Sequence, residues 1–253
     1  MKRYLHALCM CFSMFSALPA PLHIWEEEAR PLMLLFLPFV GGVIGGIWAL
    51  GGWIMQELEL PALLQGAILC SLPLLLTGCI HLDGYMDVCD AVGSCRDMEQ
   101  RRRILKDPHV GSFSVIYCIL LILGQFALLC SKKAGTPWWP LLLIPVASRI
   151  CAGFAVTLLR PMSTSEYAGV YRRGIRCGHL VWFGGLFAVV CSIGFALEGL
   201  YGMVVPVSAL GYALSILKPI HALGGMSGDI SGYGLTLGEL AGLFIYILLE
   251  GAL

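Results

Sequence analysis

Charged residues are scarce in this sequence. They make up 13% of its 253 residues, about half the fraction that is usual in a soluble domain, which argues against an ordinary soluble enzyme. The 11 cysteines form no C-x-x-C pair, so zinc or redox sites of that pattern are excluded, and we expect the cysteines to serve as small packing residues. A twin-arginine signal, an internal repeat and a low-complexity linker are also absent. The formal net charge is zero, and no nucleic-acid partner is expected.

Long apolar runs are what the sequence has instead. Hydrophobic residues make up 58% of the chain, the mean hydropathy is +0.83, and several runs approach the roughly 20 residues needed to cross a bilayer. Short connectors favour an antiparallel bundle in one integral-membrane domain, 1–253. The predicted fold is an all-α, polytopic transmembrane helical bundle with a lipid bilayer around it. About seven spans are expected, near 31–53, 61–80, 112–131, 137–159, 179–197, 200–217 and 236–253.

The N-terminal residues 4–20 form a shorter apolar stretch after a basic start. This pattern superficially resembles a signal peptide, but the apolar helices that follow favour a retained segment. We expect an interfacial or partly inserted helix there.

The basic residues indicate the orientation. Alternating spans place the N-terminus and the loops 21–30, 81–111, 160–178 and 218–235 on one side, with thirteen of the sixteen Lys and Arg residues. The positive-inside rule makes that side cytoplasmic, so we predict a multi-pass protein of the bacterial inner membrane whose active site faces the cytoplasm. The thirteen are Lys2, Arg3, Arg30, Arg96, Arg101, Arg102, Arg103, Lys106, Arg160, Arg172, Arg173, Arg176 and Lys218.

The stretch "HLDGYMDVCD" carries three aspartates where an apolar run ends. If it is helical, Asp83, Asp87 and Asp90 span only about 60° of the helix circumference. Like charges on one face repel each other, and clustered carboxylate oxygens suit a hard cation such as Mg²⁺, which also binds phosphates. The alternatives are a solvated acidic loop end or pairing with the basic run "RDMEQRRRILK".

Two residues near this cluster, His81 and Asp107, each have more than one possible role. His81 lies on the opposite side of an ideal helix, or in a turn, and whether it is a ligand stays open. Asp107 precedes Pro108, which disfavours helical geometry, so an extended or turn conformation is expected. Instead of a role in the site, Asp107 could serve as a helix N-cap or as an ion-pair partner of the preceding arginines.

A second polar segment is "KPIHALGGMSGDISGYGLTLGEL". Its glycines are expected to break the helix and let backbone N–H groups approach a ligand, although glycine also serves close helix packing in membranes. Asp229 and Glu239 flank this region, and Lys218 and His221 offer positive charge to a phosphate. The glycines are Gly224, Gly225, Gly228, Gly232, Gly234 and Gly238.

Arg149 is a charged residue inside a predicted span, in the apolar context "VASRICAG". A charge within a span usually faces the bundle interior or a water-filled cavity. Arg149 is therefore expected to neutralise a carboxylate or hold a phosphate, with snorkelling as the alternative. Carboxylates, a cation and an arginine together indicate phosphoryl transfer, and the membrane setting indicates an amphiphilic substrate.

Several segments resemble the cobalamin synthase family, the adenosylcobinamide-GDP ribazoletransferases. They are "FSMFSALPAP", "FLPFVGGVIGG", "TGCIHLDGYMDVCDA", "RRRILKDPHVGSFSVI", the pair Ser148 and Arg149, and "LGGMSGDISGYGLTLGEL". The resemblance covers most of the chain, and H-x-D-G-x-x-D-x-x-D followed by GG-x-x-GD-x-x-G is specific as a combination. It implies that a hydroxyl of α-ribazole, or of its 5′-phosphate, attacks the cobinamide-side phosphorus of adenosylcobinamide-GDP. GMP is then released and adenosylcobalamin, or its 5′-phosphate, is formed.

The resemblance also implies roles for residues and a Mg²⁺ cofactor. Asp83, Asp87 and Asp90 are expected as catalytic residues and, with Asp229, as metal ligands; one of them takes the acceptor's proton. The oligomeric state stays open. The substrate-binding candidates are His81, Asp107, Arg149, Lys218, Gly225, Gly228, Asp229 and Glu239.

The chain departs from the family in two places. It has Cys79 and Ile80 where many relatives carry glycine and a different apolar residue. The loop 160–178 matches poorly, so no residue is carried over there.

Three other functions compete with this one. A CDP-alcohol phosphotransferase would show D-x-x-D-G-x-x-A-R, but Ala91 is not followed by Arg. A prenyltransferase would need a second aspartate-rich loop of similar design. A cation transporter would place the carboxylates near mid-bilayer, whereas these lie at loop ends.

Overall fold

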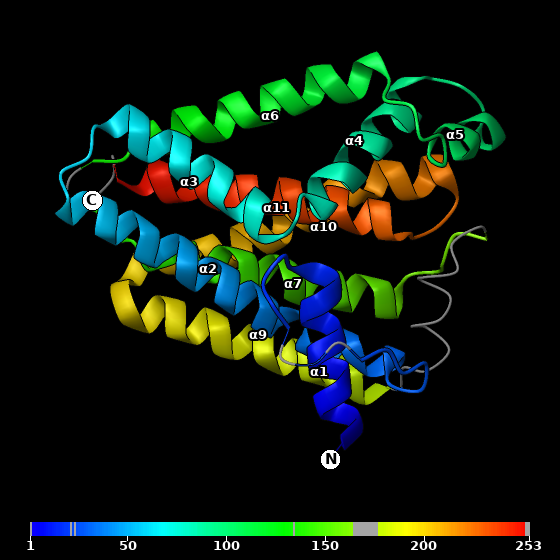
Figure 1. Ribbon diagram of the computed structural model, residues 1–253, viewed down its shortest axis with the longest axis horizontal. Helices are drawn as coiled ribbons and strands as arrows, with labels where there is room; N and C mark the ends of the chain where they lie inside the picture. Colours follow the sequence, from blue (N-terminus) through cyan, green and yellow to red (C-terminus); the bar gives the residue numbers. More distant parts are fainter. Residues whose placement is uncertain (1, 21, 23, 134, 164–176, 251–253) are drawn as a thin grey trace.

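The protein is a bundle of long helices packed side by side. The computed structural model describes residues 2–20, 22, 24–133, 135–163 and 177–250 (Figure 1). Among these residues, six helices are long and apolar enough to cross a membrane, which confirms the predicted all-α membrane bundle. They are α2 (Met33–Glu57), α6 (Ser112–Cys130), α7 (Pro140–Leu158), α9 (Cys177–Glu198), α10 (Val204–Leu223) and α11 (Gly228–Leu249).

A bent pair of helices replaces the span predicted near 61–80. Helix α3 (Ala62–Leu76) and helix α4 (Ile80–Gly93) meet at 90°, and counting them as one broken span raises the number to seven. The bend lies at Gly78 and Cys79, each with φ +60°, a left-handed conformation that a helix cannot continue through. The predicted span is therefore present as α3, which ends at Leu76, and the bend into α4 was not predicted.

The short helix α1 (Lys2–Phe15) lies near one end of the bundle and packs on α2 (Figure 1). Its buried residues Ala7, Met10 and Cys11 join the common core. After the helix, the N–H of Ala17 donates to the carbonyl of Leu76 at 2.8 Å, at the end of α3. The helix expected within 4–20 is thus present but ends at Phe15. The remaining short helices in the described part of the chain are η1 (Arg30–Leu32), α5 (Met98–Ile104) and η2 (Gly199–Met203).

Most of the glycines expected to break the last span lie inside it. Only Gly224 (φ +76°) and Gly225 (φ +147°) belong to the break between α10 and α11. Further along, a β-carbon on Gly238 would lie 2.9 Å from the carbonyl oxygen of Ser208 on α10. The prediction that the later glycines interrupt the helix was wrong, because α11 begins at Gly228 and uses them for close packing.

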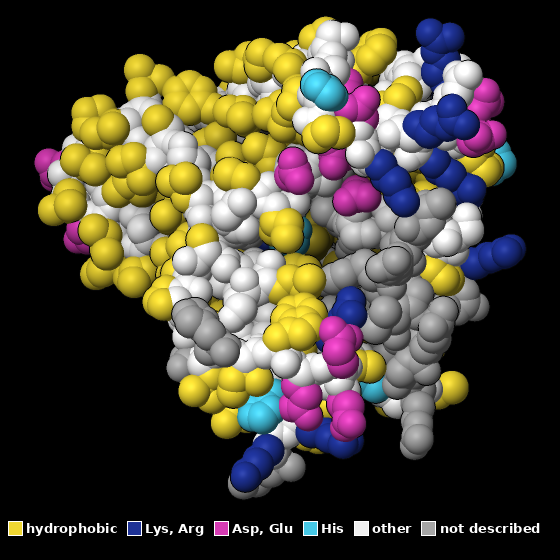
Figure 2. Space-filling model, turned by 45° about the vertical axis from the view of Figure 1, so that its right-hand side comes forward, with side chains coloured by type: hydrophobic (Ala, Val, Ile, Leu, Met, Phe, Trp, Pro, Cys, Tyr) yellow, Lys and Arg dark blue, Asp and Glu magenta, His cyan; other side chains and the backbone are white. Residues whose placement is uncertain are grey.

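The loops gather at two ends of the bundle, as the alternation of spans predicts. Helices α4 and α5 and the α10–α11 connection lie at one end, and the α2–α3 connection and the end of α11 lie at the other (Figure 1). Figure 2 shows charged side chains gathered on one side, whereas much of the opposite side is hydrophobic. Residues 164–176 of the predicted cytoplasmic loop, with Arg172, Arg173 and Arg176, fall outside the described residues.

Candidate active site

The aspartate motif lies where α4 crosses α11. Helix α4 is helical through the whole motif, as expected. A β-carbon on Gly84 would lie 2.9 Å from the Cα of Asp229, in the first turn of α11. One on Gly232 would lie 3.1 Å from the carbonyl oxygen of His81. The two glycines let the helices touch along their backbones, and this contact brings Asp229 beside Asp83 although they are far apart in sequence.

The negative charges of four aspartates, Asp83, Asp87, Asp90 and Asp229, lie near one another without a paired positive charge from the described residues. Asp87 interacts electrostatically with Asp83, Asp229 and Asp90, and Asp229 interacts with Asp83. In the described part of the chain, none of the four is ion-paired to a basic side chain. Their mutual repulsion would be relieved by a cation bound between them.

Asp90 differs from the other three aspartates. The residue is 9% exposed, and its two carboxylate oxygens accept from the backbone N–H groups of Gly111, at 2.7 Å, and Ser114, at 3.0 Å. Gly111 is the N-cap of α6 and Ser114 lies in its first turn, where backbone N–H groups have no partner within the helix. Asp90 therefore anchors the start of α6, and Asp83, Asp87 and Asp229 have more oxygens available for a ligand.

These three carboxylates fit Mg²⁺ by their chemistry rather than as a ready-made cage. Among the described residues, no three His, Cys, Asp or Glu side chains converge closely enough to enclose a metal. Mg²⁺ usually keeps several waters and is held by one or two carboxylates together with substrate phosphates. An incomplete set of hard oxygen donors is thus suitable for a metal that arrives with a phosphorylated substrate.

A cavity of about 540 Å³ opens beside the carboxylates. Asp83, Asp229 and Lys106 contribute charged groups to its lining, and His81 and Gly228 also line it. Lys106 was counted only as a basic loop residue in the sequence, where its place beside Asp107 was the only signal. The apolar lining residues include Met14, Phe15, Leu34, Leu37, Val156 and Leu235.

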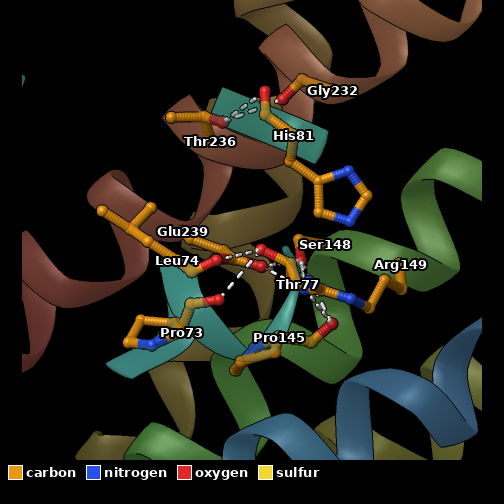
Figure 3. A network of polar contacts seen from close by, with 10 residues as sticks. All are labelled: Pro73, Leu74, Thr77, His81, Pro145, Ser148, Arg149, Gly232, Thr236 and Glu239. Atoms are coloured by element: carbon orange, nitrogen blue, oxygen red, sulfur yellow. Dashed lines mark hydrogen bonds and ion pairs between the residues drawn. The ribbon is translucent and has the colours of Figure 1, made fainter. Parts of the chain in front are cut away.

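Arg149 lies in a buried polar network on α7 (Figure 3). It is 1% exposed, forms an ion pair with Glu239 of α11 and donates to the carbonyl of Pro145 at 3.2 Å. The hydroxyl of Ser148 donates to the same carboxylate at 2.9 Å. Of the two expected roles, Arg149 here neutralises a carboxylate; it does not snorkel, and a phosphate contact stays a prediction.

His81 is packed between this network and α1. Figure 3 shows its imidazole directed toward the part of α7 that carries Ser148 and Arg149. The ring lies 6.4 Å from the ring of Phe15, centroid to centroid, with 19° between the planes. Its Nε2 is buried and has no hydrogen-bond partner among the described residues.

The remaining candidates lie outside the cavity. Asp107 occupies the expected turn, where it accepts from the N–H of His109 at 3.0 Å and contacts the ring at 2.6 Å; these hydrogen bonds lower the pKa of Asp107. It lines a separate, smaller cavity with Asp90. Lys218 is exposed on α10, and a β-carbon on Gly225 would lie 2.6 Å from the backbone nitrogen of Met162.

Comparison with known proteins identifies the family. The model of the family described as cobalamin-5-phosphate synthase matches residues 7–247. Three relatives, each named adenosylcobinamide-GDP ribazoletransferase, are similar over nearly their whole length. The Clostridium perfringens protein is 34% identical over 97% of this chain and 98% of its own, the Clostridium botulinum protein 35% over 96% and 98%, and the Lachnoclostridium phytofermentans protein 31% over 99% and 97%. No solved structure matches. The chain therefore belongs to the cobalamin-5-phosphate synthase family.

Proposed function

We propose that this protein joins adenosylcobinamide-GDP to α-ribazole and releases GMP, a step in assembling the nucleotide loop of cobalamin. The names of the relatives support this reaction. The observation that carries it is the close contact between Gly84 and Asp229, which places Asp229 beside the aspartate motif of α4, at a cavity that Asp83 and Asp229 line and that is large enough for part of a nucleotide-bearing substrate.

We propose Mg²⁺ as the cofactor, held by Asp83, Asp87 and Asp229. When bound, it supplies neutralisation of the diphosphate oxygens and aligns them for displacement. Asp90 was included among the metal ligands predicted from the sequence, but its two hydrogen bonds to α6 favour a positioning role.

Residues of the chain would then accept the proton and bind the phosphates during the displacement. The ribazole hydroxyl oxygen attacks the cobinamide-side phosphorus, the bond from that phosphorus to the bridging oxygen breaks, and GMP leaves with that oxygen. A carboxylate of the cluster accepts the hydroxyl proton. Lys106 offers positive charge to a phosphate at the same cavity, and the N-terminus of α11 favours an anion there.

We further propose that this end of the bundle faces the cytoplasm of a bacterial cell. The basic residues that the alternation of spans assigns to this side support the orientation through the positive-inside rule.

The test uses the full protein in nanodiscs with adenosylcobinamide-GDP and α-ribazole, with Mg²⁺ or with EDTA. Matched, Mg²⁺-dependent formation of GMP and adenosylcobalamin is expected. Asp87→Asn should abolish it, whereas Glu57→Gln, an exposed acid at the other end of α2, should not. Turnover that persists unchanged in EDTA would overturn the metal proposal, and no product from folded wild-type protein would overturn the reaction.

A further inference from the structure

The cavity has a deep end, which the face of α11 defines. Gly228, Gly232 and Leu235 line the cavity, and the next residue on that face, by the four- and three-residue spacing of a helix, is Glu239. Glu239 is paired with Arg149. The lining of the cavity therefore leads along α11 from the carboxylate end down to this buried ion pair.

Two more helices lead to the same place. On α2, Leu34 and Leu37 line the cavity, and a β-carbon on Gly41, one turn further, would lie 2.7 Å from Cδ of Arg149. On α7, Val156 lines the cavity and stands two turns beyond Arg149 on the same face. The Arg149–Glu239 pair therefore lies beyond the residues that line the cavity on all three helices.

The cavity is charged at one end and apolar at the other. Asp229 lies in the first turn of α11 beside Asp83, and Leu235 lies about 9 Å further along the helix axis. That depth is close to the length of a nucleoside. Apolar side chains from α1, α2, α7 and α11 make up most of the remaining lining: Met14, Phe15, Leu34, Leu37, Val156 and Leu235.

Two aromatic side chains lie in the wall of the cavity. Phe15 and His81 both line the cavity, and their rings are nearly parallel. Aromatic side chains of this kind stack on heteroaromatic bases.

We propose that the deep, apolar part of the cavity is the subsite for the benzimidazole base of α-ribazole, which packs against Phe15 and His81. The ribose then extends toward Asp83 and Asp229, where its hydroxyl can react. This inference rests on the proposed function and adds where the acceptor binds and what selects its base.

The polarity of the wall distinguishes this base from guanine. Guanine carries several donors and acceptors, and an apolar wall would leave them without partners at a large cost. The benzimidazole of a riboside has an apolar rim and one free ring nitrogen. An apolar wall therefore leaves at most this one nitrogen without a partner, a much smaller cost than for guanine.

Binding without turnover tests the proposal. Full-length protein in nanodiscs is titrated with α-ribazole alone, followed by the intrinsic fluorescence of the benzimidazole. Phe15→Ala should raise the Kd by about tenfold or more, and Phe15→Leu, which keeps apolar volume but no ring, should raise it by less. Phe39→Ala, which removes an exposed phenylalanine of α2, should leave the Kd unchanged. GMP should not displace α-ribazole, and a riboside with the more polar adenine base should bind more weakly.

The outcomes separate this inference from the reaction itself. If wild-type protein turns over but neither Phe15 variant shifts the Kd beyond twofold, or if GMP competes with α-ribazole, the base subsite is overturned and the reaction stands. If Phe15→Ala does not fold, Phe15→Leu decides by the same criterion. Wild-type protein that neither binds α-ribazole nor forms GMP would overturn both.

Discussion

Asp229 rests directly against Gly84. A β-carbon on Gly84 would lie 2.9 Å from the Cα of Asp229 and 3.0 Å from its carbonyl oxygen, so the two helices meet with no side chain between them. This contact brings the only acidic residue in the first turn of α11 beside the aspartate motif of α4.

Gly84→Ala should therefore damage the site more than the fold. The new methyl group must push α11 away from α4, which separates Asp229 from Asp83. We expect turnover to fall by about tenfold or more, because small displacements of catalytic groups are costly. Steady-state kinetics and thermal unfolding would measure the two effects. Gly46→Ala is the matched control, since nothing lies within 4 Å of the added β-carbon, and equal activity of both variants would contradict the prediction.

Asp87→Asn and Asp90→Asn should fail in different ways. Asp87→Asn should abolish turnover and leave the thermal unfolding temperature nearly unchanged. Asp90→Asn keeps one acceptor oxygen and turns an amide NH₂ toward a backbone N–H of α6, so we expect a loss of about 1–2 kcal/mol in the free energy of unfolding. Unfolding curves in detergent compare the two variants. A fully stable but inactive Asp90→Asn protein would instead make Asp90 a ligand.

The Arg149–Glu239 pair should stabilise the bundle only as a pair. Arg149→Met leaves a buried carboxylate without its cation, at an expected cost of about 3–5 kcal/mol. The double variant Arg149→Met and Glu239→Met should recover much of that loss, since two apolar side chains replace two buried charges. A double-mutant cycle on thermal stability measures the coupling, and additive losses would argue against it.

Cys79→Gly should stabilise the bend between α3 and α4. Cys79 has φ +60°, a conformation that costs a residue with a β-carbon about 1–2 kcal/mol, although glycine loses more backbone freedom on folding. We expect a net gain of up to about 1 kcal/mol with turnover unchanged. Cys79→Ala, which keeps the β-carbon, should show no such gain in the same thermal unfolding measurement.

The sequence by itself determined the class of the protein and the helix that carries the aspartates. Apolar runs of bilayer length form transmembrane helices, because backbone polar groups in hydrocarbon must be hydrogen-bonded within the segment. The spacing of Asp83, Asp87 and Asp90 likewise put them on one face of a helix, provided that the stretch was helical, and the motif combination indicated the family.

Only the tertiary structure decided which of these residues meet. Glycines in a sequence fit either a break or a close contact, and the presence of Ser208 opposite Gly238 decided for contact. The carboxylate of Asp90 accepts hydrogen bonds from the start of α6. Arg149 forms an ion pair with Glu239, ninety residues further along the chain. Such pairings depend on how helices cross, and a local pattern carries no information about the neighbour that a crossing brings.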